Sequence, residues 1–179
     1  MLLRAAAVVM VMSSALVACD DGSSPSDPVS SSSPAIVVVD GVDGLPDTVA
    51  ELPNADAEAF RALLGELEGT PVVVNLWASW CEPCKRETPM LSQAAADHPG
   101  VQFLGVDTLD SRDGAEAFIA EYSVPYPSLF DPDAFIRNDL GSFGLPVTVF
   151  FDAGGNQVGK IDGELSRGAL DENLGEIAA

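Results

Sequence analysis

The chain has 179 residues, of which 47% are hydrophobic and 20% are charged. This composition is that of a globular protein with enough apolar side chains for a core, and it excludes a wholly disordered chain. Acidic residues outnumber basic ones by 28 to 8, and the net charge of −20 disfavours nucleic acid and anionic lipid headgroups as partners. The length suits one ordinary domain.

The first 18 residues have the pattern of a secretory signal peptide. Arg4 supplies a positive start, Ala5 to Met12 form an apolar run, and Leu16-Val17-Ala18 provide small residues before a cleavage point. The apolar run is shorter than the roughly 20 residues that span a bilayer as a helix. We therefore expect residues 1–18 to direct export and not to belong to the fold.

Residues 19–35 are predicted to form a lipidated tether. Leu16-Val17-Ala18-Cys19 resembles the processing box of bacterial lipoproteins, which implies that Cys19 is acylated and anchors the chain to the membrane. The alternative is that Cys19 is a free thiol near a conventional cleavage site. From Asp20 to Pro34 the chain is almost entirely Ser, Asp, Pro and Gly, a composition typical of a flexible spacer. The folded domain is expected over residues 36–179, on the extracytoplasmic face of the cell membrane.

Strands and helices alternate through the first part of that domain. Hydrophobic periodicity and capping residues predict a helix that ends before Gly69, a strand apolar at nearly every position, and further helices and strands in turn. Alternation of this kind favours parallel strand pairing with helices on both faces of the sheet. The expected elements are a short strand at 36–39, helices at 56–67, 82–98 and 111–122, and strands at 71–77 and 101–106.

The last third of the chain has a different pattern. Two strands, Val147 to Phe151 and Gln157 to Ile161, are separated by Gly154-Gly155-Asn156, a turn that predicts a β-hairpin. A final helix is expected after Ser166. A βαβ unit followed by a hairpin and a helix is the order of a thioredoxin-like α/β domain, with a central mixed sheet flanked by helices. Element order alone leaves other α/β folds open.

The strongest chemical signal is Trp80-Cys81-Glu82-Pro83-Cys84, placed where the buried strand gives way to a helix. A Cys-x-x-Cys spacing in that context is typical of a redox-active pair. Cys81, at the start of the helix, would be favoured as a thiolate by free N–H groups and the helix dipole. Cys84, one turn later, suits the resolving step, and Pro83 stiffens the loop between the two sulfurs.

Other interpretations of the two cysteines remain open. An inert structural disulfide is one, although so small a loop constrains the unfolded chain little. A metal site is another, but structural zinc needs four ligands and, once Cys19 carries the lipid, the chain adds only His98 to the two thiols, at an expected helix end. A non-catalytic copper-binding module would use the thiols as soft ligands, and a peroxidase is a further alternative. We expect no metal and no organic cofactor.

Asn75 to Pro89, with the Cys-x-x-Cys motif at its centre, resembles the signature of the TlpA/ResA-like family of membrane-anchored thioredoxin-like proteins. A weaker likeness covers residues 36–179 and includes Gly144 to Asp152. The resemblance implies a cis peptide bond at Pro146, whereas base rates alone favour trans. It also implies that Glu87 handles protons near the sulfurs, where an ordinary solvated glutamate is the alternative.

The resemblance implies further that Trp80 packs near the sulfurs, and Trp77 is expected in the core. Leu76 and Val147 depart from the common family pattern, in which an aromatic residue and a threonine are frequent. The implied activity is thiol-disulfide exchange with exported proteins, as a reductase in processes such as cytochrome c maturation, supplied by a membrane electron-transfer partner. An oxidase that introduces disulfides would use the same residues.

Overall fold

The computed structural model describes residues 42–178. Five strands and five helices occur within this part of the chain, and the predicted elements among them follow the predicted order. In chain order they are α1 (Ala57–Glu66), β1 (Val72–Trp77), α2 (Glu82–Asp97), β2 (Gln102–Thr108), α3 (Arg112–Tyr122), β3 (Ser128–Asp131), α4 (Phe135–Asp139), β4 (Val147–Phe151), β5 (Gln157–Asp162) and α5 (Arg167–Ile177).

The strands form one mixed sheet in the order β3-β2-β1-β4-β5. β1 pairs in parallel with β2, and β2 pairs in parallel with β3, whereas β4 runs antiparallel to both β1 and β5. β1 lies at the centre, and all six of its residues are buried, which explains its nearly continuous apolar sequence. The predicted mixed sheet of a thioredoxin-like domain is confirmed.

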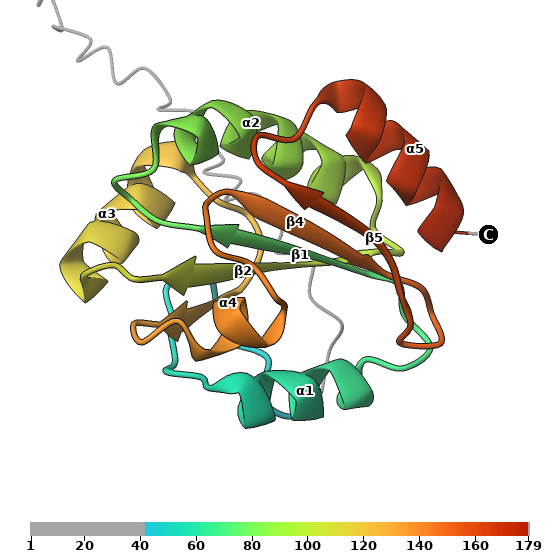
Figure 1. Ribbon diagram of the computed structural model, residues 1–179, viewed down its shortest axis with the longest axis horizontal. Helices are drawn as coiled ribbons and strands as arrows, with labels where there is room; N and C mark the ends of the chain where they lie inside the picture. Colours follow the sequence, from blue (N-terminus) through green and yellow to red (C-terminus); the bar gives the residue numbers. More distant parts are fainter. Residues whose placement is uncertain (1–41, 179) are drawn as a thin grey trace, which may run out of the picture. The chain divides into compact units, whose positions relative to one another are not determined.

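Helices cover both faces of the sheet (Figure 1). Side chains of α2, α3 and α5 pack on one face, around Trp77 and Phe103, and this core also contains both cysteines of the motif. Side chains of α1, together with Ile136 of α4, pack on the other face against alternate residues of the same strands. The sheet therefore buries apolar side chains on two sides, and the cysteines belong to the layer of α2, α3 and α5.

Two elements were not predicted, and one was predicted too short. β3 has only four residues and follows Pro125 and Pro127, while α4 has five residues, so neither gives a periodic signal. β2 continues past the predicted end at Val106 through the polar residues Asp107 and Thr108, both of which are fully buried. The expected strand at 36–39, the signal peptide and Cys19 with its tether lie outside the described residues.

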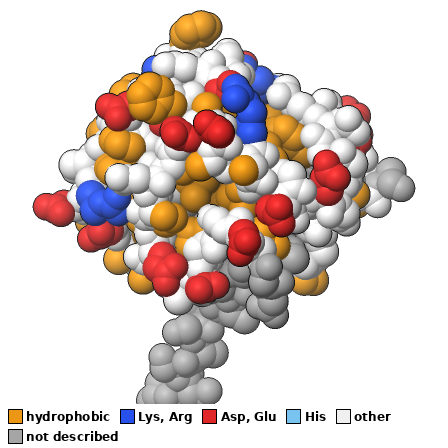
Figure 2. Space-filling view, turned by 90° about the horizontal axis from the view of Figure 1, so that it is seen from below, with side chains coloured by type: hydrophobic (Ala, Val, Ile, Leu, Met, Phe, Trp, Pro, Cys, Tyr) orange, Lys and Arg blue, Asp and Glu red, His pale blue; other side chains and the backbone are white. Residues whose placement is uncertain are grey.

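None of the helices in the described part of the chain is long and apolar enough to cross a bilayer. The space-filling view in Figure 2 shows Asp and Glu side chains spread over one face of the molecule, among hydrophobic and neutral side chains and fewer Lys and Arg. This distribution agrees with the net charge of −20. The acidic character is thus a general property of this face and is not concentrated in one cluster.

Candidate active site

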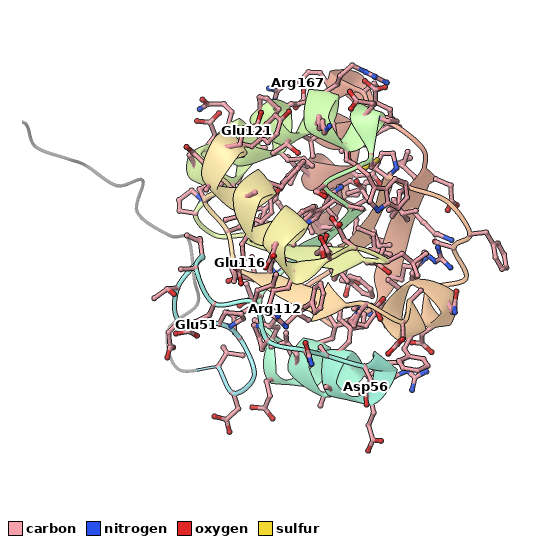
Figure 3. All side chains as sticks on the ribbon, turned by 90° about the vertical axis from the view of Figure 1, so that its left-hand side faces the viewer. Glu51, Asp56, Arg112, Glu116, Glu121 and Arg167 are labelled. Carbon is pink, nitrogen blue, oxygen red and sulfur yellow. A yellow bond between two sulfur atoms is a disulfide. The ribbon has the colours of Figure 1, made fainter. Side chains whose placement is uncertain are left out.

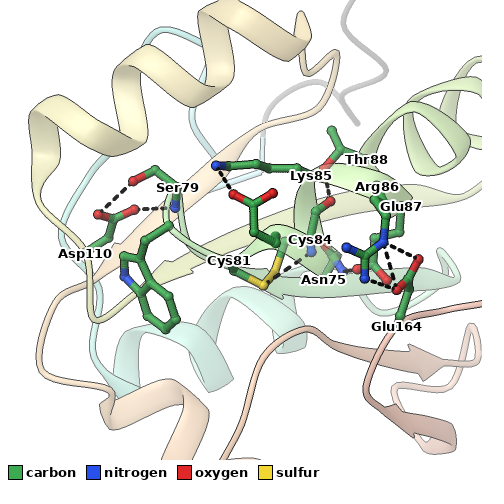
Figure 4. Close-up of a disulfide and its surroundings, with 12 residues drawn as sticks. Asn75, Ser79, Cys81, Cys84, Lys85, Arg86, Glu87, Thr88, Asp110 and Glu164 are labelled. Atoms are coloured by element: carbon green, nitrogen blue, oxygen red, sulfur yellow. Dashed lines mark hydrogen bonds and ion pairs between the residues drawn. A yellow bond between two sulfur atoms is a disulfide. The ribbon is translucent and has the colours of Figure 1, made fainter.

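Cys81 and Cys84 form a disulfide at the start of α2, with their Cα atoms 5.3 Å apart (Figure 4). Cys81 is the N-cap residue of the helix, and its Sγ accepts a hydrogen bond from the backbone N–H of Cys84 at 3.3 Å. Cys81 retains 3% of its surface exposed, whereas Cys84 has none. The sulfur expected to attack is therefore the outer one, and it accepts the Cys84 N–H in the first helical turn.

Charges beside the disulfide are largely paired with one another. The Nζ of Lys85 lies 2.6 Å from Oε1 of Glu82, and this hydrogen bond lowers the pKa of the exposed Glu82 carboxyl. The negative charge next to Cys81 is thus balanced on the same helix turn. Pro83 stands in the first turn of α2, where its missing N–H has no intrahelical partner to lose.

Glu87 is a buried carboxyl group one turn beyond Cys84, with an exposed fraction of 2%. Its Oε1 accepts a hydrogen bond from Nδ2 of Asn75 at 2.8 Å, and its Oε2 accepts one from the backbone N–H of Leu165 at 2.7 Å. Burial raises the pKa of Glu87 to about 7, against the opposing effect of these two donors. Glu87 is therefore buried near the motif and is not an ordinary solvated glutamate.

Pro146 follows a cis peptide bond from Leu145, as the family resemblance implies and base rates alone do not. It directly precedes Val147 in β4, which pairs with Leu76 near the end of β1 that leads to Cys81. Trp77 is in the core, as predicted. Trp80 is 56% exposed and hydrogen-bonds through Nε1 to a loop carbonyl at 3.1 Å, so it is not packed in the core.

Two partners of Glu87 were missed by sequence reasoning. Asn75 is the one polar residue of β1, and its side chain bridges Glu87 and the hydroxyl of Thr148, 3.2 Å away on β4. Its polarity within an apolar strand was a signal that could have been used. The backbone N–H of Leu165 carries no such signal, because only the fold brings it next to α2.

The described residues contain no group of three or more His, Cys, Asp or Glu side chains placed to hold a metal ion. His98 is exposed and is the C-cap residue of α2, as predicted from the Pro99-Gly100 that follows it. The candidate site residues described above are two cysteines joined by a disulfide and one buried carboxyl group.

Comparison with known proteins identifies the class. The chain is 34% identical to the thiol:disulfide interchange protein HelX of Rhodobacter capsulatus, over 73% of this chain and 69% of HelX. It is 38% identical to the thiol:disulfide interchange protein DsbE of Escherichia coli, although that match covers 49% of this chain and only 47% of DsbE. Among solved structures, dsbF of Mycobacterium tuberculosis is 33% identical with a TM-score of 0.59, over 62% of this chain and 83% of that one. The chain is thus a thiol-disulfide oxidoreductase with a thioredoxin-like fold.

Residues 44–157 match the AhpC/TSA family. The chain belongs to this family and, within it, to the thiol-disulfide oxidoreductases of the TlpA/ResA/DsbE type. The family resemblance carried by Asn75 to Pro89 is confirmed. The match spans most of the described residues, from the segment before α1 to the start of β5.

Proposed function

We propose that this protein reduces disulfides of exported proteins, with Cys81 as the attacking sulfur and Cys84 as the resolving one. The observation that carries the proposal is the position of Cys81 at the N-cap of α2, where its Sγ accepts the N–H of Cys84. A thiolate at this point gains from the helix dipole and from the hydrogen bond that the Cys84 N–H donates. Cys84 lies fully buried behind it, within reach of Cys81.

The reaction transfers two electrons from the dithiol to the substrate. The thiolate of Cys81 attacks one sulfur of the substrate disulfide, a mixed disulfide forms, and the other substrate sulfur leaves as a thiolate. The thiolate of Cys84 then attacks the Cys81 sulfur, the Cys81–Cys84 disulfide forms, and the second substrate sulfur leaves. A membrane dithiol partner must then reduce the pair again before another turnover.

Glu87 is proposed to accept the proton of the Cys84 thiol during the resolving step. A pKa of about 7 leaves this carboxyl poised to exchange a proton at neutral pH. Glu87 follows Cys84 by three residues on α2, the spacing at which side chains share a helix face. Asn75 and Leu165 hold the carboxyl oxygens in place through the two hydrogen bonds described above.

The proposed location is the extracytoplasmic face of the cell membrane. Residues 1–18 would direct export, acylation of Cys19 would anchor the chain, and residues 19–35 would separate the domain from the bilayer. Substrates would then be exported protein thiols and disulfides, such as cysteines reduced during cytochrome c maturation. Labelling with an alkyne fatty acid tests the anchor, because a Cys19→Ala variant should lose the label while a Cys81→Ala variant keeps it.

The equilibrium reduction potential of the purified protein, measured against defined dithiol buffers, tests the direction of electron flow. If the protein is a reductase, the reduction potential of the pair should lie toward about −270 mV, the value of thioredoxin. A value well above about −200 mV, toward the strong oxidants, would contradict the reductase and favour an oxidase.

Trapping tests the two roles. Cys84→Ser should accumulate a mixed disulfide with substrate proteins, because the resolving thiol is missing, and Cys81→Ser should not. Trapping by Cys81→Ser instead would reverse the roles, and failure of the wild-type pair to cycle would refute the proposed exchange.

A further inference from the structure

Asp107 is a buried carboxyl group that the proposed reaction does not use. It lies near the end of β2, paired in register with Trp77 of β1 and with Phe130 of β3, and its exposed fraction is 0%. Side chains alternate along a strand, so Asp107 points to the same face as Phe103, the face covered by α2 and α3. A carboxyl group thus lies in the same layer as the disulfide.

Neither carboxyl oxygen of Asp107 has a hydrogen-bond donor among the described residues. The charged groups that act on it are the carboxylates of Asp110 and Asp131 and the guanidinium of Arg112, and the carboxyl of Asp110 lies within hydrogen-bonding reach. Two carboxylates are both acceptors, so their contact becomes a hydrogen bond only when one of them carries a proton. An ionised Asp107 would face two like charges without a donor of its own.

Arg112 does not form a salt bridge with Asp107, because its guanidinium is engaged elsewhere. Arg112 donates hydrogen bonds to the carbonyl of Leu52 and to the side chain of Asn54, and it lies 4.4 Å from the ring centroid of Phe130. Figure 3 shows Arg112 at the end of α3 nearest to α1. Among the described residues, the positive charge that acts on Asp107 is thus engaged in other contacts.

Asp110 binds the segment that leads to Cys81. Its carboxylate accepts hydrogen bonds from both the backbone N–H and the hydroxyl of Ser79, the latter at 3.0 Å (Figure 4). Next to it, the carbonyl of Leu109 accepts the indole N–H of Trp80 at 3.1 Å. The loop after β2 thus holds the two residues that immediately precede Cys81.

We propose that Asp107 is a positioning residue that keeps its proton and donates it to the Asp110 carboxylate, so that the pair fixes the Ser79–Trp80 segment and with it the sulfur of Cys81. Burial, followed by the charge of Asp110, raises the pKa of Asp107 to about 9, consistent with a protonated group at neutral pH. The inference rests on the proposed function in that the fixed sulfur is the attacking one.

The protonation of the pair is tested by following the side-chain carboxyl ¹³C signal of Asp107 against pH in the full chain. The signal, assigned by its loss in Asp107→Asn, should titrate several pH units above the ordinary value of about 3.9. Asp110→Asn should move this midpoint to lower pH, because it removes a like charge and supplies an amide donor. A midpoint below about pH 5 in the wild type, or no change in Asp110→Asn, would overturn the shared proton.

The positioning role is tested by the pH profile of iodoacetamide alkylation at Cys81 in the reduced protein. Asp107→Ala should change the rate constant at pH 7 by about tenfold, less than the roughly 100-fold that a 1 Å misplacement can cost. Asp107→Asn, whose amide can still donate to Asp110, should match the wild-type rate at pH 7. Above about pH 9, where Asp107 ionises, the wild-type rate should change, and this change should be absent in Asp107→Asn. Asp113→Asn, an exposed charge on α3, should match the wild type throughout.

Identical profiles for all four proteins would overturn the positioning role. If Asp107→Ala does not fold, the alkaline difference between Asp107→Asn and the wild type decides the question alone. A wild-type protein that fails to exchange disulfides refutes the proposed function. The Asp107 titration then still tests whether Asp107 keeps its proton and shares it with Asp110.

Discussion

Two buried carboxyl groups lie in the same layer as the disulfide, and their surroundings differ. Glu87 is 2% exposed and accepts hydrogen bonds from Asn75 and from the backbone of Leu165. Asp107 is fully buried and has no donor among the described residues. In Figure 4, Glu87 and Asp110, the neighbour of Asp107, appear on opposite sides of the two cysteines.

The difference shows how donors decide what a buried carboxyl can do. Burial favours the neutral form of both groups, and hydrogen bonds to the charged form oppose that effect. Two donors leave the pKa of Glu87 at about 7, while Asp107, without donors and beside Asp110, has a pKa of about 9. Glu87 can therefore exchange a proton at neutral pH, whereas Asp107 retains one.

The largest expected effect is on stability, from Asp107→Asn. An acid whose folded pKa is raised destabilises the fold as pH rises from its unfolded value, about 4, to its folded value, about 9. At pH 7 this amounts to up to about 4 kcal/mol, which a neutral amide avoids. Denaturant unfolding should show the variant more stable than the wild type at pH 7 and not at pH 3. A variant less stable than the wild type at pH 7 would contradict the protonated state.

Glu87→Gln should slow disulfide exchange by about 100-fold, at the lower end of what general acid–base groups contribute. The wild-type rate should rise with pH through about 7, because the ionised carboxyl accepts the Cys84 proton. This rising limb of the pH–rate profile should be absent in the variant. Insulin reduction across the pH range measures both. The exposed Glu121 on α3 offers a control, since Glu121→Gln should keep the wild-type limb. A limb that persists in Glu87→Gln would assign the proton transfer to another group.

Asn75→Ala removes one of the two donors to Glu87 and should make the two carboxyl sites more alike. The pKa of Glu87 should rise above about 7, which shifts the activity limb to higher pH. Leaving Oε1 unpaired should also cost about 1–3 kcal/mol of stability at pH values where Glu87 is ionised. Thr148→Val is the matched control, because it removes the other contact of Asn75 and leaves Glu87 paired. An unmoved limb in Asn75→Ala would show that this donor does not tune Glu87.

The smallest expected effect comes from Arg86→Gln. Arg86 pairs with Glu164, the residue before the Leu165 donor, but both side chains are exposed, at 59% and 42%. Exposed ion pairs contribute about 0.2–1 kcal/mol, so stability should fall by no more than this, as in Arg167→Gln, which removes another exposed pair. A loss above about 2 kcal/mol would mean that the pair holds Leu165 against Glu87.

Much of the fold could be predicted because most of its helices, strands and turns leave a recognisable signal in a short stretch of sequence. The apolar run of β1, the N-caps Asp56, Ser111 and Ser166, and the glycine turn between β4 and β5 each leave a signal in a few residues. β3 and α4 were missed because elements of four or five residues are too short to show a hydrophobic periodicity. β2 extends beyond its predicted end at Val106, because the tertiary structure buries the polar residues Asp107 and Thr108 within the strand.

By itself the sequence indicated the candidate redox pair, since the Cys-x-x-Cys spacing at a strand-to-helix junction is a local property and the chain supplies both sulfurs within four residues. It also indicated Glu87 and Pro146 through the family resemblance. The tertiary structure alone decided how the carboxyl groups are held. Asn75, Leu165 and Asp110 come from segments far apart in the chain, and their donors and charges act on Glu87 and Asp107 only after the sheet and helices bring them together.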